Sequence, residues 1–178
     1  MKTLISTGGR KKILEKVLSN PGKPYGVRAL AATVGVSPGA VSIFMRALEK
    51  DGIMKKKVPD LSNPEVRALK ILFNVEKVRS IYGKLAKKFK IAGMGVYGSW
   101  AKGENTEDSD LDVWIRVEKE PSALETSEIR RIVKEGAGVA NASILFITQE
   151  SLKRMREKDS VFYSTLFHSF VIGGEGIA

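Results

Sequence analysis

Cysteine is absent from this 178-residue chain, which excludes disulfides, thiolate chemistry and cysteine-ligated zinc. Histidine and glutamine each occur once, as His168 and Gln149. No apolar run approaches the roughly 18 residues that a membrane span needs. Residues 1–7 are too short and too polar a stretch for a secretory signal. We therefore expect a cytoplasmic protein that makes no use of a membrane.

Acidic residues are scarce in the first half of the chain. Residues 1–90 hold 20 Lys+Arg against 6 Asp+Glu, a net charge of +14, whereas residues 91–178 hold 10 against 14, a net of −4, and the two sum to the overall +10. Such asymmetry predicts one half that meets a polyanion and another half with a different task. The alternative is a lysine-rich solvated surface of the kind found in thermophilic proteins, which the single glutamine also fits.

Helical patterns fill the first 50 residues. The segment "RKKILEKVLSN" has apolar residues at helical spacing and is stopped by "NPG". A second short helix ends at Gly35, and Ser37 followed by Pro38 is a good start for a third, which runs to about Lys50. Two short helices joined by a tight glycine turn predict a helix-turn-helix.

The stretch "LAATVGVSPGAVSIFMRALEKDGIMKKK" resembles the winged helix-turn-helix domains of bacterial and archaeal regulators. That resemblance implies double-stranded DNA as a partner, with the later helix in the major groove and the wing on the backbone. The wing looks short, because "VPDLSNP" leaves little room for a returning strand. A protein-docking role is the alternative. The candidate DNA contacts are Ser37, Ala40, Ser42, Ile43 and Arg46 on the helix, and Lys55, Lys56 and Lys57 on the wing.

Residues 64–90 read as connecting helices, with Asn63 as a cap and Asn74 as a candidate break between two of them. Apolar residues from Val75 to Phe89 recur at intervals of three and four, so one stripe is expected to be buried. The opposite face is basic. We expect it to be solvated, with an extension of the nucleic-acid footprint as the alternative.

The stretch "YGSWAKGENTEDSDLDVWI" carries the chemistry. A strand over residues 91–98 ends at Gly98 and Ser99, where the glycine permits a sharp turn and the serine can cap a short helix, "AKGEN", whose free N–H groups attract phosphate. The following strand, "SDLDVWIRV", places Asp110 and Asp112 on one face. Carboxylates about 7 Å apart along a strand repel each other unless a cation lies between them. Mg²⁺ (or Mn²⁺) with a bound triphosphate suits such a pair.

This combination resembles the nucleotidyltransferase superfamily that includes DNA polymerase β, and most closely the minimal nucleotidyltransferases of prokaryotes. The resemblance implies an α+β protein whose second domain has a mixed sheet with helices on one face. It implies transfer of NMP from Mg·NTP to an acceptor, which is left open as protein, RNA or small molecule. It assigns Gly98, Ser99 and Lys102 to phosphate, and Asp110 and Asp112 to catalysis and metal. The residues that carry the match are Gly98, Ser99, Lys102, Gly103, Ser109, Asp110 and Asp112.

The sequence departs from that family at its third catalytic carboxylate, which lies on a later strand. The best match to the strand is "VANASILFIT", where Asn141 and Ser143 occupy the candidate positions and Ser143 fits better. Glu150 lies beyond the strand. We interpret His168 as structural, with a general base as the alternative.

We therefore predict a winged helix-turn-helix domain over residues 1–63, connecting helices over 64–90 and a nucleotidyltransferase domain over 91–178, its first helix covering about 75–90. Two other functions stay open. One is a DNA-binding transcriptional regulator whose catalytically weak second domain senses nucleotide. The other is a toxin–antitoxin component that modifies a partner protein. A homodimer is also left open.

Overall fold

The structure is a computed structural model and describes residues 7–177. The chain divides into two compact units, Met1–Lys70 and Ile71–Ala178, hereafter the N-terminal and C-terminal units. The boundary falls inside helix α4 (Pro64–Lys88), which runs unbroken through Asn74. The candidate break at Asn74 is therefore wrong, and one continuous helix takes the place of two connecting helices.

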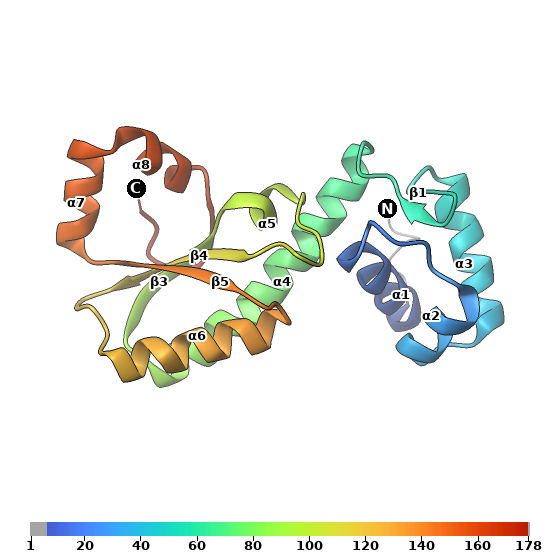
Figure 1. Cartoon of the computed structure of the whole chain (residues 1–178), viewed down its shortest axis with the longest axis horizontal. Coiled ribbons are helices and arrows are strands. Elements are labelled where there is room, and N and C mark those ends of the chain that lie inside the picture. The colour runs from blue at the N-terminus through green and yellow to red at the C-terminus, as the bar shows by residue number, and fades with distance from the viewer. Residues whose placement is uncertain (1–6, 178) are drawn as a thin grey trace. The chain divides into compact units, whose positions relative to one another are not determined.

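The N-terminal unit begins with three helices, α1 (Gly8–Ser19), α2 (Val27–Val34) and α3 (Pro38–Lys50), all labelled in Figure 1. Gly35 ends α2 in the left-handed conformation, with φ of 67°. The Ser37 side chain then accepts a hydrogen bond from the backbone N–H of Ala40 at 3.3 Å, with Pro38 at the first helical position. The predicted helices and the predicted start of α3 are confirmed.

A very short hairpin follows α3. Strands β1 (Met54–Lys55) and β2 (Val58–Pro59) pair antiparallel, Met54 with Pro59 and Lys55 with Val58. Lys56 and Lys57 form the turn with φ of 50° and 63°, a conformation that hairpin turns need and that residues with a side chain resist. This hairpin, with two residues per strand, lies where the sequence predicts a short wing.

The C-terminal unit is built on one mixed sheet. Its strands lie in the order β5-β4-β3-β6, where β4 and β5 are parallel and the other neighbours antiparallel. The predicted mixed sheet is confirmed. The strands are β3 (Ile91–Val96), β4 (Leu111–Val117), β5 (Ala142–Ile147) and β6 (Phe170–Gly174).

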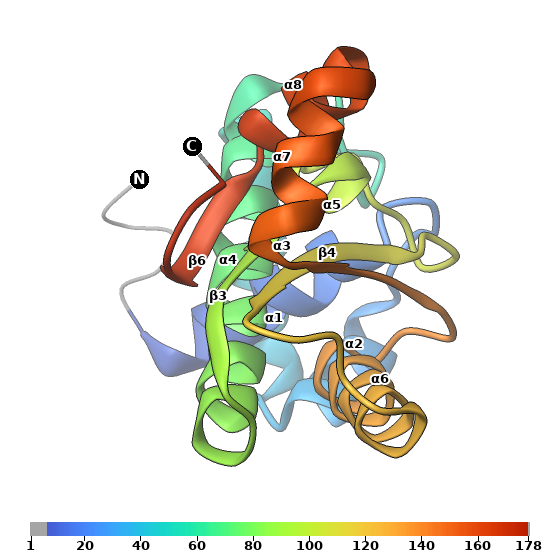
Figure 2. The ribbon, with the colours of Figure 1, turned by 90° about the vertical axis from the view of Figure 1, so that its left-hand side faces the viewer.

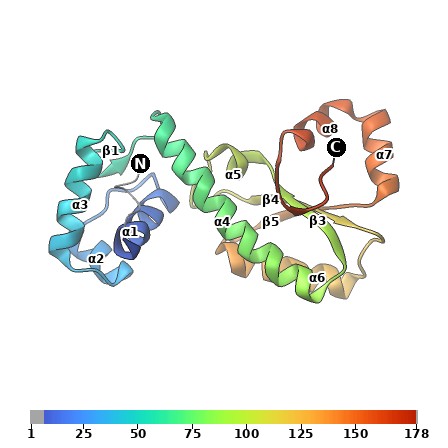
Figure 3. The ribbon, with the colours of Figure 1, turned by 180° about the vertical axis from the view of Figure 1, so that it is seen from behind.

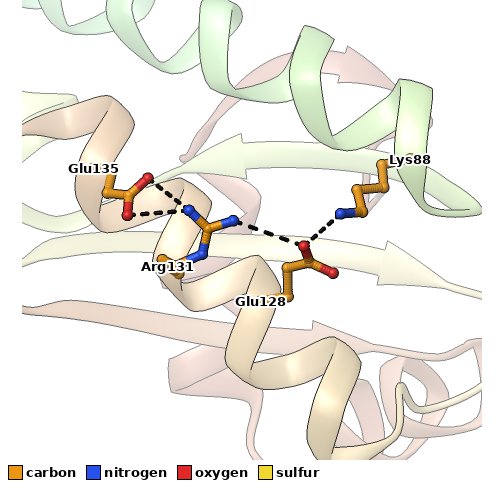
Figure 4. Close-up of polar contacts among 4 residues, drawn as sticks. All are labelled: Lys88, Glu128, Arg131 and Glu135. Carbon is orange, nitrogen blue, oxygen red and sulfur yellow. Dashed lines mark hydrogen bonds and ion pairs between the residues drawn. The ribbon is translucent and has the colours of Figure 1, made fainter.

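One face of this sheet is closed by α4 and by α6 (Ala123–Ala137), seen from behind in Figure 3. The core between them takes alternate residues of β4, starting with the fully buried Leu111 and Val113. At its surface, Lys88 of α4 pairs with Glu128 of α6, and Arg131 reaches both Glu128 at 3.7 Å and Glu135 at 2.9 Å (Figure 4). Exposed pairs of this kind contribute little stability. Apolar burial therefore closes this face.

The opposite face is also covered in part, by α7 (Gln149–Lys158) and α8 (Ser160–Phe167), as Figures 1 and 2 show. Trp114 of β4 is fully buried there with Ile147 and Leu166. Its ring lies so close to Gly95 that a Cβ on that residue would stand 2.3 Å away. The expectation of helices on one face is therefore wrong, because an indole and its apolar neighbours on the second face need covering as well.

Among residues 7–177, no single helix is both long and apolar enough to cross a membrane. The pair α2 and α3, bent by 112°, passes that test on length and composition alone. Many of its apolar side chains, among them Leu30, Val41 and Leu48, are buried in the N-terminal unit.

Candidate active site

Gly98 brings the glycine-serine turn into contact with Asp112. Helix α5 (Gly98–Lys102) starts directly after β3, and Gly98 has φ of 66°. A Cβ on Gly98 would stand 2.4 Å from Asp112 Oδ2, and the Tyr97 N–H donates to the Asp112 carbonyl at 3.1 Å. Only glycine satisfies both the conformation and the space here. The two halves of the sequence motif therefore meet in the fold.

Alternation along β4 sends Asp112 to the face away from α4 and α6, and Asp110 directly precedes this strand. Leu111 and Val113 point into the core, while Asp110 is exposed and Asp112 half-buried. Burial raises the pKa of Asp112, and the charge of Asp110 raises it further. Both effects penalise the ionised carboxylate. A cation between the two side chains would relieve both.

Ser99 does not cap the helix, contrary to the sequence expectation. α5 begins three residues earlier than the predicted "AKGEN" helix, so Tyr97 is the N-cap and makes no side-chain capping bond. Ser99 lies within the first turn, half-buried, and Lys102 ends the helix with an exposed side chain. Gly103 closes it with φ of 67°. Ser99 and Lys102 remain phosphate candidates on the grounds of the motif alone.

A buried asparagine fixes the loop between α5 and β4. Asn74 of α4 donates through Nδ2 to the Trp100 carbonyl at 2.8 Å and to Asn105 Oδ1 at 2.9 Å. Farther along, the Thr106 N–H donates to Ser109 Oγ at 2.8 Å, directly before Asp110. Asn74, where the sequence suggested a helix break, instead anchors the loop that leads to the aspartates. The local sequence around Asn74 does not indicate this role.

Ser143 lies beside Asp112. The two residues are partners in the parallel β4–β5 register, and the Leu111 N–H donates to the Asn141 carbonyl at 3.3 Å. Asn141 and Ser143 are both exposed. Ser143, the better match to the third carboxylate position, is thus the neighbour of Asp112 across the sheet.

Tyr97 is the residue of this site that sequence reasoning missed. Its ring meets that of Phe162 edge-on at 6.5 Å between centroids and packs against the apolar cluster around Trp114. Burial raises the pKa of Tyr97, and the charge of Asp112 adds to that rise. The available signal was its position directly before the Gly98 turn at the end of β3.

Neither His168 nor a larger group of metal-ligating side chains is part of this candidate site. His168 Nδ1 lies 2.7 Å from the Ser164 carbonyl at the end of α8, and its ring packs edge-on against Phe167. Within residues 7–177, no group of three or more His, Cys, Asp or Glu side chains is arranged to hold a metal ion. Asp110 and Asp112 are therefore considered as a pair of candidate cation ligands.

The candidate DNA contacts lie on the surface of the N-terminal unit. Ile43 is 61% exposed, an unusual position for isoleucine, and Ser42 is half-buried. The exposed members on α3 and its cap are Ser37, Ala40, Ile43 and Arg46, and those on the hairpin are Lys55, Lys56 and Lys57.

Two of the hairpin lysines have intramolecular partners. Lys55 Nζ pairs with Asp60 at 2.6 Å, and this pairing, together with Ser62, lowers the pKa of Asp60 to about 2. The backbone N–H of Lys57 donates to Glu49 Oε1 at 3.0 Å. The hairpin turn therefore presents Lys56 and Lys57, whereas Lys55 shares its charge with an aspartate.

Comparison with known proteins adds a family to this geometry. Residues 77–168, just over half of the chain, match the model of the nucleotidyltransferase domain, and the chain belongs to that family. The match contains the Gly98 turn, both aspartates and Ser143. It leaves out the N-terminal unit.

Three relatives are named as protein adenylyltransferases. Protein adenylyltransferase MntA of Thermococcus cleftensis is 32% identical over 73 residues, 40% of this chain and 74% of that protein. A putative protein adenylyltransferase of Methanocaldococcus jannaschii is 27% identical over 96 residues, 52% of this chain and 93% of its own length. A second from the same organism is 23% identical over 97 residues, 53% of this chain and 99% of its length. The matches cover 74 to 99% of the relatives but only 40 to 53% of this chain.

Proposed function

We propose that the C-terminal unit transfers AMP from ATP to a hydroxyl of a partner protein, and that the N-terminal unit binds double-stranded DNA. The observation that carries the first part is the contact between Gly98 and Asp112. A phosphate-binding turn and a carboxylate pair can act on the same nucleotide only when they lie side by side. Here they lie so close that a methyl group on Gly98 would clash with the Asp112 carboxylate. The family match supports the same reaction class.

The two carboxylates suit a divalent cation. Asp112 is desolvated beside Asp110, so the pair gains from a hard cation that oxygen ligands prefer. Asp110 and Asp112 would hold Mg²⁺ or Mn²⁺, which when bound neutralises charge on the transferred phosphorus and on the departing pyrophosphate.

The protein's own residues would orient the nucleotide. The backbone N–H groups at the start of α5 have no partners within the helix and would donate to phosphate oxygens, with Ser99 Oγ beside them. Lys102 is exposed on the same helix and would add a positive charge. The anchoring of the loop by Asn74 would keep Asp110 in place as substrate binds.

The acceptor is proposed from the relatives, whose names describe adenylyl transfer to protein. The charges of the residues around the aspartates favour a protein acceptor over an RNA end. Glu104, Glu107 and Asp108 precede Asp110 and are exposed, so the approach to the site is acidic. An RNA would meet repulsion there, whereas a neutral or basic protein segment would not. A protein acceptor also fits a toxin–antitoxin pair, in which one component is modified by the other.

For the N-terminal unit, we propose a winged helix-turn-helix with α3 in the major groove. The support is a short helix pair joined at Gly35, exposed Ile43 and Arg46 on α3, and two lysines at the tip of a hairpin. Residues 1–70 hold 14 Lys+Arg against 5 Asp+Glu, a net charge of +9. Affinity for duplex DNA should fall steeply as salt rises, because bound counterions are released.

A regulator that senses nucleotide without turnover is the second candidate, favoured by the missing third acid. Incubation with radiolabelled ATP, Mg²⁺ and lysate of the source cells separates the two. Label should pass to a protein with the wild type and not with Asp110→Asn. Lys119→Gln, a substitution in the loop after β4, serves as the control that should leave transfer intact. Binding of ATP without any labelled product would select the sensing role.

For the DNA part, the binding measurement uses a duplex library at low salt. Arg46→Ala should weaken binding and relax sequence preference, whereas Lys56→Gln should weaken binding to all sequences alike. Absence of duplex affinity in the wild type would make the N-terminal unit a protein-docking module.

A further inference from the structure

The short helix that follows the glycine turn is held from one side by α4. Helix α5 has five residues, too few for stability in isolation, so contacts with other elements must fix its position. Its middle residue, Trp100, is buried in the core between the sheet and the pair α4 and α6. Two residues of α4, Asn74 and Lys77, contact Trp100, and Figures 1 and 3 show α5 beside α4.

Asn74 uses both protons of its side-chain amide. Its Nδ2 donates to the Trp100 carbonyl at 2.8 Å and to Asn105 Oδ1 at 2.9 Å. Since an amide nitrogen has two N–H donors and a carbonyl only accepts, one orientation of the Asn74 amide suits both partners. The Trp100 carbonyl lies near the end of α5, where the Gly103 N–H reaches it only at 3.4 Å. Asn74 therefore completes the end of α5 and also binds the loop that follows.

Lys77 lies three residues after Asn74 and so on the same face of α4. Its Nζ is 5.8 Å from the centre of the Trp100 ring, within the range of a cation–π contact, and donates to the Ala137 carbonyl at 3.1 Å. Ala137 is the last residue of α6, where the helix dipole favours a cation. The half-buried ammonium group of Lys77 is thus held beside the indole ring.

The position of Trp100 matters for both halves of the candidate site. Trp100 lies two residues after Gly98, whose turn contacts Asp112, so a shift of Trp100 moves the proposed phosphate-binding turn. Asn105 belongs to the loop that ends at Asp110, directly before β4. A single buried amide of α4 therefore holds the turn and the loop in register with each other.

We propose that Asn74 and Lys77 are positioning residues of the nucleotide site and act through Trp100. This inference rests on the proposed function, because the turn and the aspartates must bind nucleotide and metal for their positions to matter. Lys77 acts on the turn alone, through the Trp100 ring. Asn74 acts on the turn and, through Asn105, on the loop that carries Asp110.

Metal-free ATP and Mg·ATP separate these two roles. Lys77→Met keeps a long side chain without the charge, and it should weaken binding of both forms several-fold and by the same factor, because only the phosphate-binding turn is disturbed. Asn74→Leu keeps the volume and removes both donors. It should weaken binding of Mg·ATP by a larger factor than binding of ATP, because the loop that leads to the metal-binding aspartates is displaced as well.

Lys88 provides a matched control on the same helix. Lys88 pairs with Glu128, so it links α4 to α6 as Lys77 does, but it is the last residue of α4, three turns away from Lys77. Lys88→Gln removes one positive charge, as Lys77→Met does. It should leave the affinities for ATP and Mg·ATP unchanged.

The experiment is calorimetric titration of the full chain and its variants with ATP, in EDTA and in Mg²⁺, after circular dichroism and melting curves have established that each variant folds. Wild-type affinity of Asn74→Leu for both forms would overturn the inference and leave the proposed function standing. An equal loss for both forms in that variant would overturn the action of Asn74 on the aspartate loop.

The other variants keep the test decisive. If Asn74→Leu does not fold, unchanged ATP affinity in Lys77→Met would overturn the inference. A loss in Lys88→Gln as large as that in Lys77→Met would also overturn it, because the cause would then be net charge or the packing of α4 on α6. A wild type that binds neither ATP nor Mg·ATP would remove the proposed function and this inference together.

Discussion

Each of the two units has an ionisable side chain that is at least half-buried, and the two differ in their neighbours. In the N-terminal unit, Lys70 is 2% exposed and donates to the Leu18 carbonyl at 3.1 Å. That carbonyl is near the end of α1, where helices leave carbonyls without partners. In the C-terminal unit, half-buried Asp112 has Asp110 as a neighbouring charge of its own sign. The Lys70 ammonium group therefore has a backbone carbonyl as its partner, whereas the Asp112 carboxylate lies near a charge of its own sign.

The contrast distinguishes Lys70, whose charge has a partner within the fold, from Asp112, for which we propose a functional role. Burial lowers the pKa of Lys70 to about 8, yet its ammonium group still serves as a donor to a backbone carbonyl. Burial disfavours the charged form of both residues, and for Asp112 the charge of Asp110 disfavours it further, raising the pKa of that carboxyl. A protein tolerates such a position when a ligand makes up for it. The strained Lys56 and Lys57 turn of the hairpin is a second unfavourable position at a candidate binding surface.

The largest expected effect concerns Lys70. The pKa of this lysine is about 8 in the folded chain and 10.5 ordinarily, so the unfolded state holds more protons between these values. Stability should therefore rise as the pH goes from about 8 to about 10.5, by up to about 3 kcal/mol. Lys70→Met has no ionisable group at this position and should lack this rise. At pH 9 and above, the variant should be less stable than the wild type, because the Leu18 carbonyl loses its hydrogen-bond partner.

The two tryptophans make that measurement specific. Trp100 and Trp114 both belong to the C-terminal unit, so their fluorescence follows that unit, while far-UV circular dichroism follows both. The difference between wild type and Lys70→Met should appear in the dichroism curves and be small in fluorescence. Parallel pH curves for the two proteins would contradict a buried charged lysine.

A second prediction concerns the missing acid. Ser143→Asp, or failing that Asn141→Asp, should raise metal-dependent transfer at least several-fold, toward the roughly 100-fold that a positioned base contributes. Ser143 is the better site because its register partner is Asp112. Single-turnover transfer from labelled ATP is the measurement. Fast wild-type transfer that neither substitution improves would place the base elsewhere.

A third prediction is a substitution that stabilises the protein, whereas most substitutions destabilise it. Asp112→Asn should stabilise the nucleotide-free protein at neutral pH by about 0.5–2 kcal/mol, as relief of an unfavourable functional group often does. A raised folded-state pKa costs stability only where the carboxylate is ionised, so the gain should shrink as the pH falls toward 3.8. Tryptophan fluorescence during urea unfolding measures it. A loss of stability in this variant would show that Asp112 is a structural charge like Lys70.

Sequence patterns predicted the local elements well, because helices and strands follow from short-range periodicity. The caps at Gly35 and Ser37 and the mixed sheet agree with the structure, and a strand that contains Asp112 lies where it was predicted, although it begins at Leu111, directly after Asp110. The aspartates and Gly98 were found because their motif is continuous in sequence.

The errors concern contacts between distant segments. Asn74 is polar in the middle of a helix and therefore suggested a break, but its partners Trp100 and Asn105 lie about 30 residues away in sequence. The pairing of Asp112 with Ser143 depends on a β5 register that no local pattern encodes. The cover over Trp114 depends likewise on how α7 and α8 return to the sheet.

The smallest expected effect concerns the hairpin turn of the N-terminal unit. It tests whether the residues with strained backbone, Lys56 and Lys57, are also the residues that bind DNA. Replacing Lys56 and Lys57 by Asn and Gly suits the left-handed turn and should stabilise the unit by about 1 kcal/mol. The same change should weaken duplex DNA binding, because two charges are lost. Chemical unfolding followed by circular dichroism and a salt series of DNA binding give both readings. Unchanged DNA affinity would remove the hairpin tip from the interface.

The most direct test of a cation site between Asp110 and Asp112 is calorimetric titration of the full chain with ATP, with and without Mg²⁺. The wild type should bind Mg·ATP more tightly than ATP alone and melt at a higher temperature in its presence. In the double variant Asp110→Asn, Asp112→Asn the metal-dependent gain should vanish while the fold persists. An undiminished gain in the double variant would contradict the account and place the metal elsewhere.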